Sequence, residues 1–252
     1  MLPIQWIILI SIFILIYYCL HQSHGREFFN NTSPTLDVAV IVEPRQHKYL
    51  IPVIRNIMSN LPDSTMVQLF HGTKNLDFIN QHLGKYVSTG RLRLTNLGVQ
   101  NLTINDYNKL LTSKTFWNSI SGENILIFQT DSCLCRNGQY KLHKLLEYDY
   151  IGAPWKLSSL PILTGGNGGL SFRKKSKMLE VCERYQAGNE DLFFSSQKSF
   201  RYPTRLLAKN LFIETIPGEQ PFGIHKPWDY LTDVEMTKLS EDCPEIKTIF
   251  NK

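Results

Sequence analysis

The chain has 252 residues, of which 42% are hydrophobic and 19% are charged, and its formal net charge is +5 at pH 7. This length and composition fit one sizeable globular domain, and the sequence contains no internal repeat, heptad run or low-complexity tract. Its basic residues are spread along the chain instead of forming a stripe with interleaved aromatic residues. We therefore expect no nucleic-acid partner.

The first residues are predicted to form a membrane anchor. Residues 2–20 carry no charged side chain, and about 19 residues at about 1.5 Å of rise each can cross a hydrocarbon core of about 30 Å. The alternative is a cleaved signal peptide, which would begin with basic residues and end in small ones. Because this segment does neither, we expect an uncleaved transmembrane anchor over residues 1–21, followed by a short polar stem over residues 22–35.

The cysteines leave the cellular compartment open, whereas the glycosylation triplets favour a lumenal domain. Cys133, Cys135, Cys182 and Cys243 show no zinc-ligand spacing, and we expect free, partly buried thiols. Asn-x-[Ser/Thr] triplets, which permit glycosylation in a secretory lumen, begin at Asn30, Asn31 and Asn101.

Strands and helices are predicted to alternate through the first half of the domain. Residues 37–42 are apolar and mostly β-branched after the initial Asp, as expected for a strand buried on both faces. Apolar residues at a helical period predict a helix over residues 48–60. The same reasoning predicts strands over residues 66–70, 91–94 and 124–128 and helices over residues 77–83 and 107–120. This alternation predicts an α/β domain with a mostly parallel central sheet that is flanked by helices.

Polar residues follow the predicted strands at the point where each strand ends. Glu43 and Arg45 follow the first strand, His71 follows the second, and Asp131 follows the strand over residues 124–128. In open sheets of this kind, ligands bind beyond the carboxyl ends of the strands. The sequence therefore predicts a ligand site at this edge of the sheet.

The second half has shorter predicted strands and more turn residues. Glycine dominates residues 165–169, an Asn-Glu-Asp triplet ends at Asp191, and a Phe-Gly-Ile-His run ends at His225. A helix is predicted over residues 174–185. These motifs are the remaining candidates for a site.

Each motif also has a purely structural explanation. Asp131 can form a turn or cap a helix, and the glycines can form a flexible loop; no Gly-Lys-[Ser/Thr] follows them, which disfavours a phosphate loop of the nucleoside-triphosphatase kind. Glu190 and Asp191 suit the first turn of a helix as well as a role as a base. A lone histidine such as His225 is more often a structural hydrogen-bonding residue than a metal ligand.

The order of these motifs resembles the core of the GT-A glycosyltransferases. The sequence resembles more closely an uncharacterised glycosyltransferase-like family, a domain of unknown function that occurs in fungi and large DNA viruses. This resemblance covers roughly residues 36–228. The segments that carry it are residues 42–45, 128–132, 149–155, 166–171, 189–191 and 222–225.

The resemblance implies a role for each motif residue. Asp131 and His225 would bind a divalent metal, Mn²⁺ or Mg²⁺, with Gln129 where many relatives have a first acid. Asp191 would be the general base for the acceptor hydroxyl, and Glu190 would hold the acceptor or the base. The implied donor-binding residues are Glu43, Arg45, Gln129, Asp131, Gly168 and Gly169, and the implied acceptor-binding residues are Trp155, Asn167 and Trp228.

The resemblance also implies a fold, an activity and partners. The domain over residues 36–252 would be GT-A-like, with a nucleotide-binding half over residues 36–131 and an acceptor and metal half over residues 132–252. It would transfer a sugar, expected to be a hexose, with inversion from a nucleotide-diphosphate sugar to a glycan, protein or lipid acceptor. The chain would be a single-pass type II membrane protein with this domain in the lumen of the endoplasmic reticulum or Golgi.

Two other functions stay open at this point. A catalytically degenerate transferase would bind a glycan or nucleotide at the membrane without turnover, and Gln129 in place of an acid favours this alternative. A nucleotidyltransferase would need clustered carboxylates for two metal ions, which the sequence around Asp131 lacks.

Overall fold

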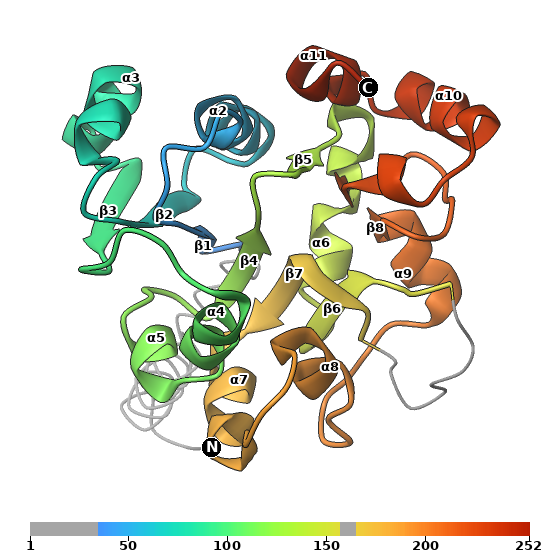
Figure 1. The fold of residues 1–252 in the computed structure, drawn as a ribbon. Coiled ribbons are helices and arrows are strands. Elements are labelled where there is room, and N and C mark those ends of the chain that lie inside the picture. Colours follow the sequence, from blue (N-terminus) through green and yellow to red (C-terminus); the bar gives the residue numbers. More distant parts are fainter. Residues whose placement is uncertain (1–34, 157–164) are drawn as a thin grey trace, which may run out of the picture. The chain divides into compact units, whose positions relative to one another are not determined.

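The computed structural model describes residues 35–156 and 165–252, and Figure 1 shows their arrangement. The first half contains β1 (Val38–Glu43), α2 (Leu50–Asn60), β2 (Met66–His71), α3 (Leu76–Ser88), β3 (Leu92–Asn96), α4 (Ile104–Leu111), α5 (Lys114–Asn118) and β4 (Asn124–Phe128). The second half contains β5 (Ser132–Leu134), η1 (Arg136–Lys141), α6 (Leu142–Leu145), β6 (Tyr150–Ala153), β7 (Asn167–Lys174), α7 (Lys175–Val181), η2 (Cys182–Arg184), α8 (Glu190–Ser195), α9 (Arg205–Leu211), β8 (Phe212–Ile213), β9 (Gly223–His225), η3 (Pro227–Asp229), α10 (Asp233–Asp242) and α11 (Glu245–Phe250).

The main sheet has the strand order β3-β2-β1-β4-β7-β6. Strands β1 to β4 pair in parallel, and β7 pairs antiparallel with both β4 and β6. The predicted α/β fold with a mostly parallel sheet and flanking helices is confirmed. The antiparallel direction of β7 was not predicted, and it carries the glycine-rich segment back along the edge of β4.

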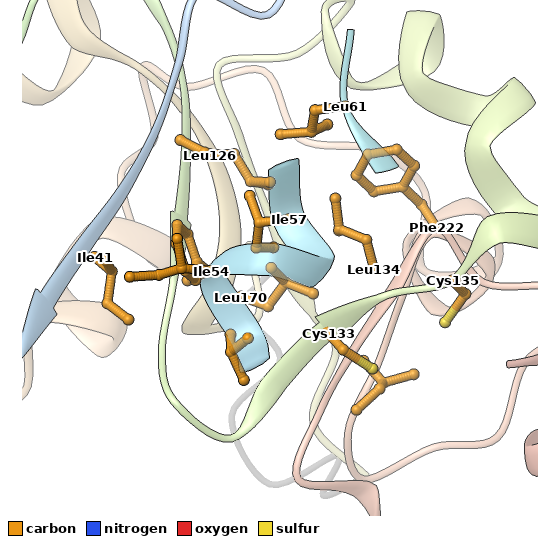
Figure 2. Close-up of a cluster of buried hydrophobic side chains, with 14 of the residues drawn as sticks. Ile41, Ile54, Ile57, Leu61, Leu126, Cys133, Leu134, Cys135, Leu170 and Phe222 are labelled. Atoms are coloured by element: carbon orange, nitrogen blue, oxygen red, sulfur yellow. The ribbon is translucent and has the colours of Figure 1, made fainter. Parts of the chain in front are cut away.

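Side chains alternate between the two faces of the sheet, because successive residues of a strand point in opposite directions. Ala39 and Ile41 of β1 pack into a core with α2 and α3, whereas Val38 and Val40 pack into a second core with α4, α5, α7 and α8. Figure 2 shows part of the first core, where Ile54 and Ile57 of α2 lie against Ile41, Leu126 and Leu170 of the sheet. Figure 1 shows the two groups of helices on opposite sides of the sheet. Burial on both faces explains the continuous apolar run of β1.

A small second sheet joins two distant parts of the chain. Its strand order is β5-β9-β8, and the antiparallel register of β5 and β9 pairs Ser132 with His225. The backbone N–H of Lys226 also donates to the carbonyl of Asp131 at 2.9 Å. This ladder therefore brings Asp131 and His225 together although 94 positions separate them in the chain (225 − 131).

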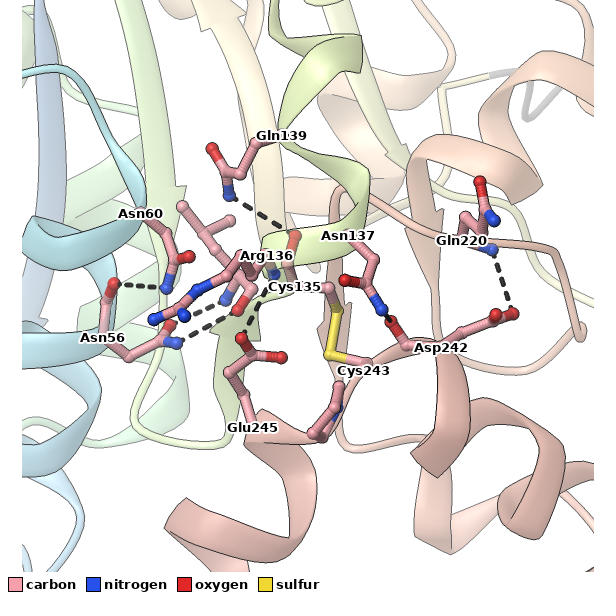
Figure 3. The surroundings of a disulfide bond; sticks show 12 residues. Asn56, Asn60, Cys135, Arg136, Asn137, Gln139, Gln220, Asp242, Cys243 and Glu245 are labelled. Atoms are coloured by element: carbon pink, nitrogen blue, oxygen red, sulfur yellow. Dashed lines mark hydrogen bonds between the residues drawn. A yellow bond between two sulfur atoms is a disulfide. The ribbon is translucent and has the colours of Figure 1, made fainter.

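A disulfide bond joins Cys135 and Cys243, which are 108 residues apart. The expectation of free thiols is wrong for these two cysteines and right for Cys133 and Cys182, which are free and buried. Sequence alone did not find the pair because the two half-cystines meet only once β5 packs beside α11 (Figure 3). Asn56 of α2 fixes the same strand, since its amide exchanges two hydrogen bonds with the backbone of Leu134, at 2.8 and 3.0 Å.

The predicted helix over residues 107–120 is divided into α4 and α5. Thr103 and Ser113 each accept a hydrogen bond from a backbone N–H in the first turn of the helix that follows. Ser113 therefore starts a new helix where the sequence period suggested continuation. The predicted helix over residues 174–185 likewise ends early, at Val181, and continues as a 3₁₀ turn.

The predicted anchor over residues 1–21 lies outside the described residues, and so does the stem apart from its last residue. Among the residues that are described, no helix is both long enough and apolar enough to span a bilayer.

Candidate active site

A cavity of about 480 Å³ opens at the carboxyl ends of β1 and β4. Its walls come from the loops after these strands, the start of β7, the amino-terminal parts of α4 and α8, and the end of β9. This is the edge of the sheet at which the sequence predicted a ligand site. The predicted residues that line the cavity are Glu43, Arg45, Gln129, Asp131, Asn167, Gly169, Glu190, Asp191 and His225.

His225 is buried and has neighbours at both ring nitrogens. Its Nδ1 lies 2.9 Å from Glu214 Oε1, and its Nε2 lies 3.2 Å from Asp131 Oδ1 and 3.2 Å from Gln129 Oε1. The structure thus brings the two predicted metal ligands, Asp131 and His225, into direct contact. It also adds Glu214, which is only 2% exposed and which the sequence analysis did not single out.

The surrounding carboxylates change the pKa values of this group. Burial lowers the pKa of His225, but its close contacts with the carboxylates of Asp131 and Glu214 raise it by more, to about 8. Burial raises the pKa of Asp131, and the contact with His225 outweighs that effect, so the pKa of Asp131 lies below its ordinary value. The protein therefore stabilises a positive charge at the point where these side chains meet.

The same atoms fit a divalent cation. Asp131 Oδ1 is buried and has no partner in hydrogen-bonding geometry, although His225 Nε2 lies 3.2 Å away. A histidine that binds a metal usually donates its other ring N–H to a carboxylate, and Glu214 is placed to accept it from His225. Within residues 35–156 and 165–252, no cluster of three His, Cys, Asp or Glu side chains could hold a metal. A cation here would therefore need an oxygen from Gln129 or from a substrate.

Asp191 lines the cavity at the start of α8, and its neighbour Glu190 is tied to the core. The two Glu190 carboxylate oxygens lie 2.8 and 3.1 Å from the guanidinium nitrogens of Arg173, which is fully buried. Because both oxygens are taken, Glu190 is poorly suited to hold an acceptor, and support of Asp191 is the role that fits its contacts. Burial raises the pKa of Asp191, and the charge of Glu190 raises it further.

Arg173 is a further residue that the sequence did not reveal. Its guanidinium carbon lies between 5.1 and 5.9 Å from the ring centroids of Trp117, Tyr150 and Phe194. Aromatic faces attract a cation that has lost its water. A single arginine in an apolar strand carried no signal of this pairing, because its partner Glu190 lies 17 residues further along the chain.

Glu43 and Arg45 lie together at the end of β1. Their side chains form an ion pair with two contacts of 2.8 Å, in which Glu43 is buried and the Arg45 side chain is 56% exposed. The amide of Asn75 donates to the backbone carbonyls of both residues, which fixes the loop. The exposed guanidinium is available to an anionic ligand.

The glycines of β7 allow two close approaches of the backbone. A Cβ on Gly169 would lie 2.3 Å from ring atoms of His225, and a Cβ on Gly168 would lie 2.5 Å from an Arg173 nitrogen. Gly169 lines the cavity, whereas Gly168 lies against the Arg173–Glu190 pair. The contacts of Gly168 therefore give no support to its predicted role in donor binding.

The two tryptophans that were predicted to bind the acceptor do not line this cavity. The ring of Trp228 lies 4.8 Å from that of Phe250 and packs against the core. The backbone carbonyl of Trp155 accepts a hydrogen bond from Arg205. Asn167 does line the cavity, and its amide nitrogen lies 3.4 Å from Asp191 Oδ2. The geometry thus supports an acceptor contact for Asn167, whereas this cavity gives no support to the predicted acceptor role of Trp155 and Trp228.

A family model described as "Protein of unknown function (DUF5672)" matches residues 92–225, which is more than half of the chain. The chain belongs to the DUF5672 family. This agrees with the predicted resemblance to a domain of unknown function, and the occurrence in fungi and large DNA viruses stays a prediction. The matched segment of this DUF5672 protein includes Gln129, Asp131, Asp191 and His225.

No curated protein matches this DUF5672 protein. Solved structures that resemble it include a mannosyltransferase from Pyrobaculum calidifontis in complex with GDP-Man and Mn²⁺, which is 13% identical with a TM-score of 0.48 over 75% of this chain and 61% of that chain. The glycosyltransferase GlyE of Streptococcus pneumoniae is 12% identical with a TM-score of 0.49 over 86% of this chain and 62% of that chain. TarS of S. aureus is 14% identical with a TM-score of 0.44 over 67% of this chain and 60% of that chain. The DUF5672 protein thus spans about three fifths of the length of these structures, and likenesses of this size assign it no substrate.

Proposed function

We propose that this protein is a glycosyltransferase that moves a sugar, expected to be a hexose, from a nucleotide-diphosphate sugar to an acceptor hydroxyl. The observation that carries the proposal is the contact of 3.2 Å between Asp131 Oδ1 and His225 Nε2 in a cavity that Asp191 also lines. A cation-binding pair and a separate, half-buried carboxylate are the groups that such a transfer needs, one for the leaving diphosphate and one for the attacking hydroxyl.

Asp191 is the proposed general base. Its carboxylate accepts the proton of the acceptor hydroxyl while the hydroxyl oxygen attacks the anomeric carbon, and the bond to the diphosphate breaks on the opposite side, which inverts the anomeric centre. The raised pKa of Asp191 brings its basicity closer to the working pH, which favours proton transfer. Asn167, 3.4 Å from this carboxylate, is placed to orient it or the acceptor.

Asp131 and His225 are the proposed ligands of Mn²⁺ or Mg²⁺. When bound, such an ion supplies positive charge that stabilises the departing diphosphate. The carboxylate of Glu214 holds the ring of His225 through Nδ1, so that Nε2 points to Asp131. Arg45, held by Glu43, is the proposed contact for the nucleotide.

The disulfide bond bears on the proposed location. Structural disulfides persist in oxidising compartments and are rare in the cytosol. The Cys135–Cys243 bond therefore supports a domain that faces a secretory lumen, in line with the predicted type II topology.

A catalytically degenerate binding protein is the second candidate, and Gln129 in place of an acid is the observation that favours it. The test is a screen of the full-length protein in detergent against a panel of nucleotide sugars, with Mn²⁺ or with EDTA. We expect release of nucleoside diphosphate from at least one donor in Mn²⁺ and its loss in EDTA. Binding of a donor without any release would contradict the proposed activity and favour the binding protein.

A further inference from the structure

Gln129 stands where the glycosyltransferase resemblance places an acid, and both ends of its amide are engaged. Its Nε2 donates to the hydroxyl of Tyr107 at 3.1 Å, and its Oε1 lies 3.2 Å from His225 Nε2. Its backbone N–H donates to Ser132 Oγ at 3.3 Å. Tyr107 thus turns the carbonyl oxygen of Gln129 toward His225.

Two oxygens lie close to one ring nitrogen: Nε2 of His225 is 3.2 Å from Asp131 Oδ1 and 3.2 Å from Gln129 Oε1. Without a cation, a proton on Nε2 serves these oxygens, in line with the raised pKa of His225. A divalent cation that displaces this proton would be bound by Nε2 and the two oxygens, while Glu214 accepts the proton on Nδ1. Oxygen and nitrogen atoms bound to one Mn²⁺ or Mg²⁺ at right angles lie about 3 Å apart. The two distances of 3.2 Å match that spacing.

The ligand set of Asp131, Gln129 and His225 carries less negative charge than a metal site with two acidic ligands. Asp131 contributes one negative charge, whereas Gln129 and a neutral His225 contribute none. Affinity for hard divalent cations falls as the number of charged ligands falls. The phosphate oxygens of a nucleoside diphosphate would supply the missing negative charge at the same point.

We propose that Gln129 is a neutral third ligand, held in place by Tyr107, and that the cation is therefore bound tightly only together with a nucleoside diphosphate. This inference rests on the proposed function in one respect, namely that the cavity accepts such a nucleotide. Tyr107 is a positioning residue, because it acts on the cation only through the amide of Gln129.

The test is Mn²⁺ binding to the full-length protein in detergent, followed by the electron paramagnetic resonance signal of free Mn²⁺. Titrations are run with Mn²⁺ alone and with saturating UDP or GDP, and a protein-free nucleotide titration gives the baseline. We expect at least about tenfold tighter binding with one of the nucleotides, since phosphate oxygens add charged ligands. Equal affinity with and without both nucleotides would overturn the proposal.

Substitutions distinguish the role of Gln129 from that of Tyr107. Gln129→Glu keeps the shape and adds a charge, so we expect about ten- to a hundredfold tighter binding of Mn²⁺ alone. Gln129→Ala and Tyr107→Phe should each weaken binding of Mn²⁺ with nucleotide, the latter by about ten- to a hundredfold. Gln81→Glu and Tyr140→Phe are matched controls at exposed positions outside the cavity and should leave affinity unchanged.

The result is distinguishable from failure of the proposed function. If these affinities behave as expected but no nucleotide sugar is turned over, the cation site stands and the protein is a binding module. If a sugar is transferred but Gln129→Glu and Gln129→Ala both leave the Mn²⁺ affinity unchanged, the function stands and the role of Gln129 is wrong. Thermal unfolding of each variant shows whether it is folded, so a misfolded Gln129→Glu protein leaves Gln129→Ala as the deciding variant.

Discussion

At the scale of single residues, Asp191 is held in a position that costs the folded state some stability. Its carboxylate is largely buried beside the charge of Glu190, and both effects raise its pKa. A group whose pKa is raised on folding contributes stability at low pH and loses it as the pH rises through the folded pKa. The ionised base that the reaction requires is therefore the less stable form in the folded protein.

Asp191→Asn should separate these two effects. We predict that kcat falls by about 10²- to 10⁴-fold, the usual size of a general-base contribution, while donor affinity is retained. At neutral pH the midpoint of thermal unfolding should rise, because the penalty for ionising Asp191 is removed. In the unmodified protein kcat should fall as the pH drops through a midpoint above the ordinary aspartate value. An equal loss of donor affinity, or no change for Asp191→Asn relative to the exposed control Asp229→Asn, would contradict the assignment.

A substitution at Gly168 tests the buried Arg173–Glu190 pair, which supports the proposed base Asp191. A Cβ at this position would lie 2.5 Å from an Arg173 nitrogen and 2.6 Å from Glu190 Oε1. We predict that Gly168→Ala costs about 1–3 kcal/mol of unfolding free energy, as overpacking does, and lowers kcat. Gly84→Ala is the matched control, since a Cβ there meets nothing within 4 Å and lies inside α3; it should stabilise the protein by about 0.5–1 kcal/mol. Urea unfolding measures both, and a neutral Gly168→Ala would show that the pair has room to move.

At the scale of elements, the strands were the most predictable part of the fold. The run over residues 124–128 coincides with β4, and that over residues 37–42 is one residue from β1, because burial on both faces demands consecutive apolar residues. The proximity of Asp131 and His225 was predicted from the resemblance to the GT-A glycosyltransferases. The ladder that makes it could not be read from the sequence, since β5 and β9 have three residues each and show no clear period.

Glu214 and the Arg173–Glu190 pair are parts of the site that were not predicted from the sequence. Glu214 follows the two-residue strand β8 directly, so the rule that singled out Asp131, a carboxylate after a strand, would have found it had β8 been recognised. Arg173 and Glu190 pair only because β7 runs antiparallel and brings α8 over the sheet. Such pairings depend on tertiary packing and leave no local pattern.

The amino-terminal cap of α4 links local structure to the site. Thr103 and Asp106 form a reciprocal capping box, and the helix carries Tyr107 and Asn108, whose amide oxygen accepts from the N–H of Glu190. We predict that Thr103→Ala costs about 0.5–2 kcal/mol and also lowers kcat and nucleotide affinity.

The control for this cap is Thr232→Ala, which removes the equivalent residue of α10, outside the cavity lining. It should lower the urea midpoint to a similar extent and leave activity unchanged. If both variants lose stability and neither loses activity, α4 does not position the site.

At the scale of the whole molecule, the Cys135–Cys243 bond joins the end of β5 to the segment between α10 and α11, 108 residues further along the chain. The backbone N–H of Arg136 donates to Glu245, and the amide of Asn137 donates to the carbonyl of Asp242, so hydrogen bonds accompany the bond on either side (Figure 3). These contacts fix the end of β5, and the start of the same strand follows Asp131. The disulfide and its hydrogen bonds therefore help to hold Asp131 in its place in the site.

Removing the disulfide should destabilise the folded protein. For a double Cys135→Ala and Cys243→Ala variant we predict a loss of about 2–5 kcal/mol, as is typical when a bond that closes a long loop is removed. Dithiothreitol should destabilise the unmodified protein by a similar free energy, which is measured as a lower unfolding midpoint. It should leave the midpoint of the variant unchanged. Equal sensitivity of both proteins to dithiothreitol would show that this bond does not stabilise the fold.

The most direct measurement is a crystal structure of the protein with Mn²⁺ and UDP or GDP, in which anomalous scattering locates the metal. We predict an anomalous peak within bonding distance of Asp131 and His225, with the diphosphate bound to the metal and Asp191 facing the open side of the cavity. A nucleotide bound outside this cavity, or a metal that contacts neither Asp131 nor His225, would contradict glycosyl transfer at this site.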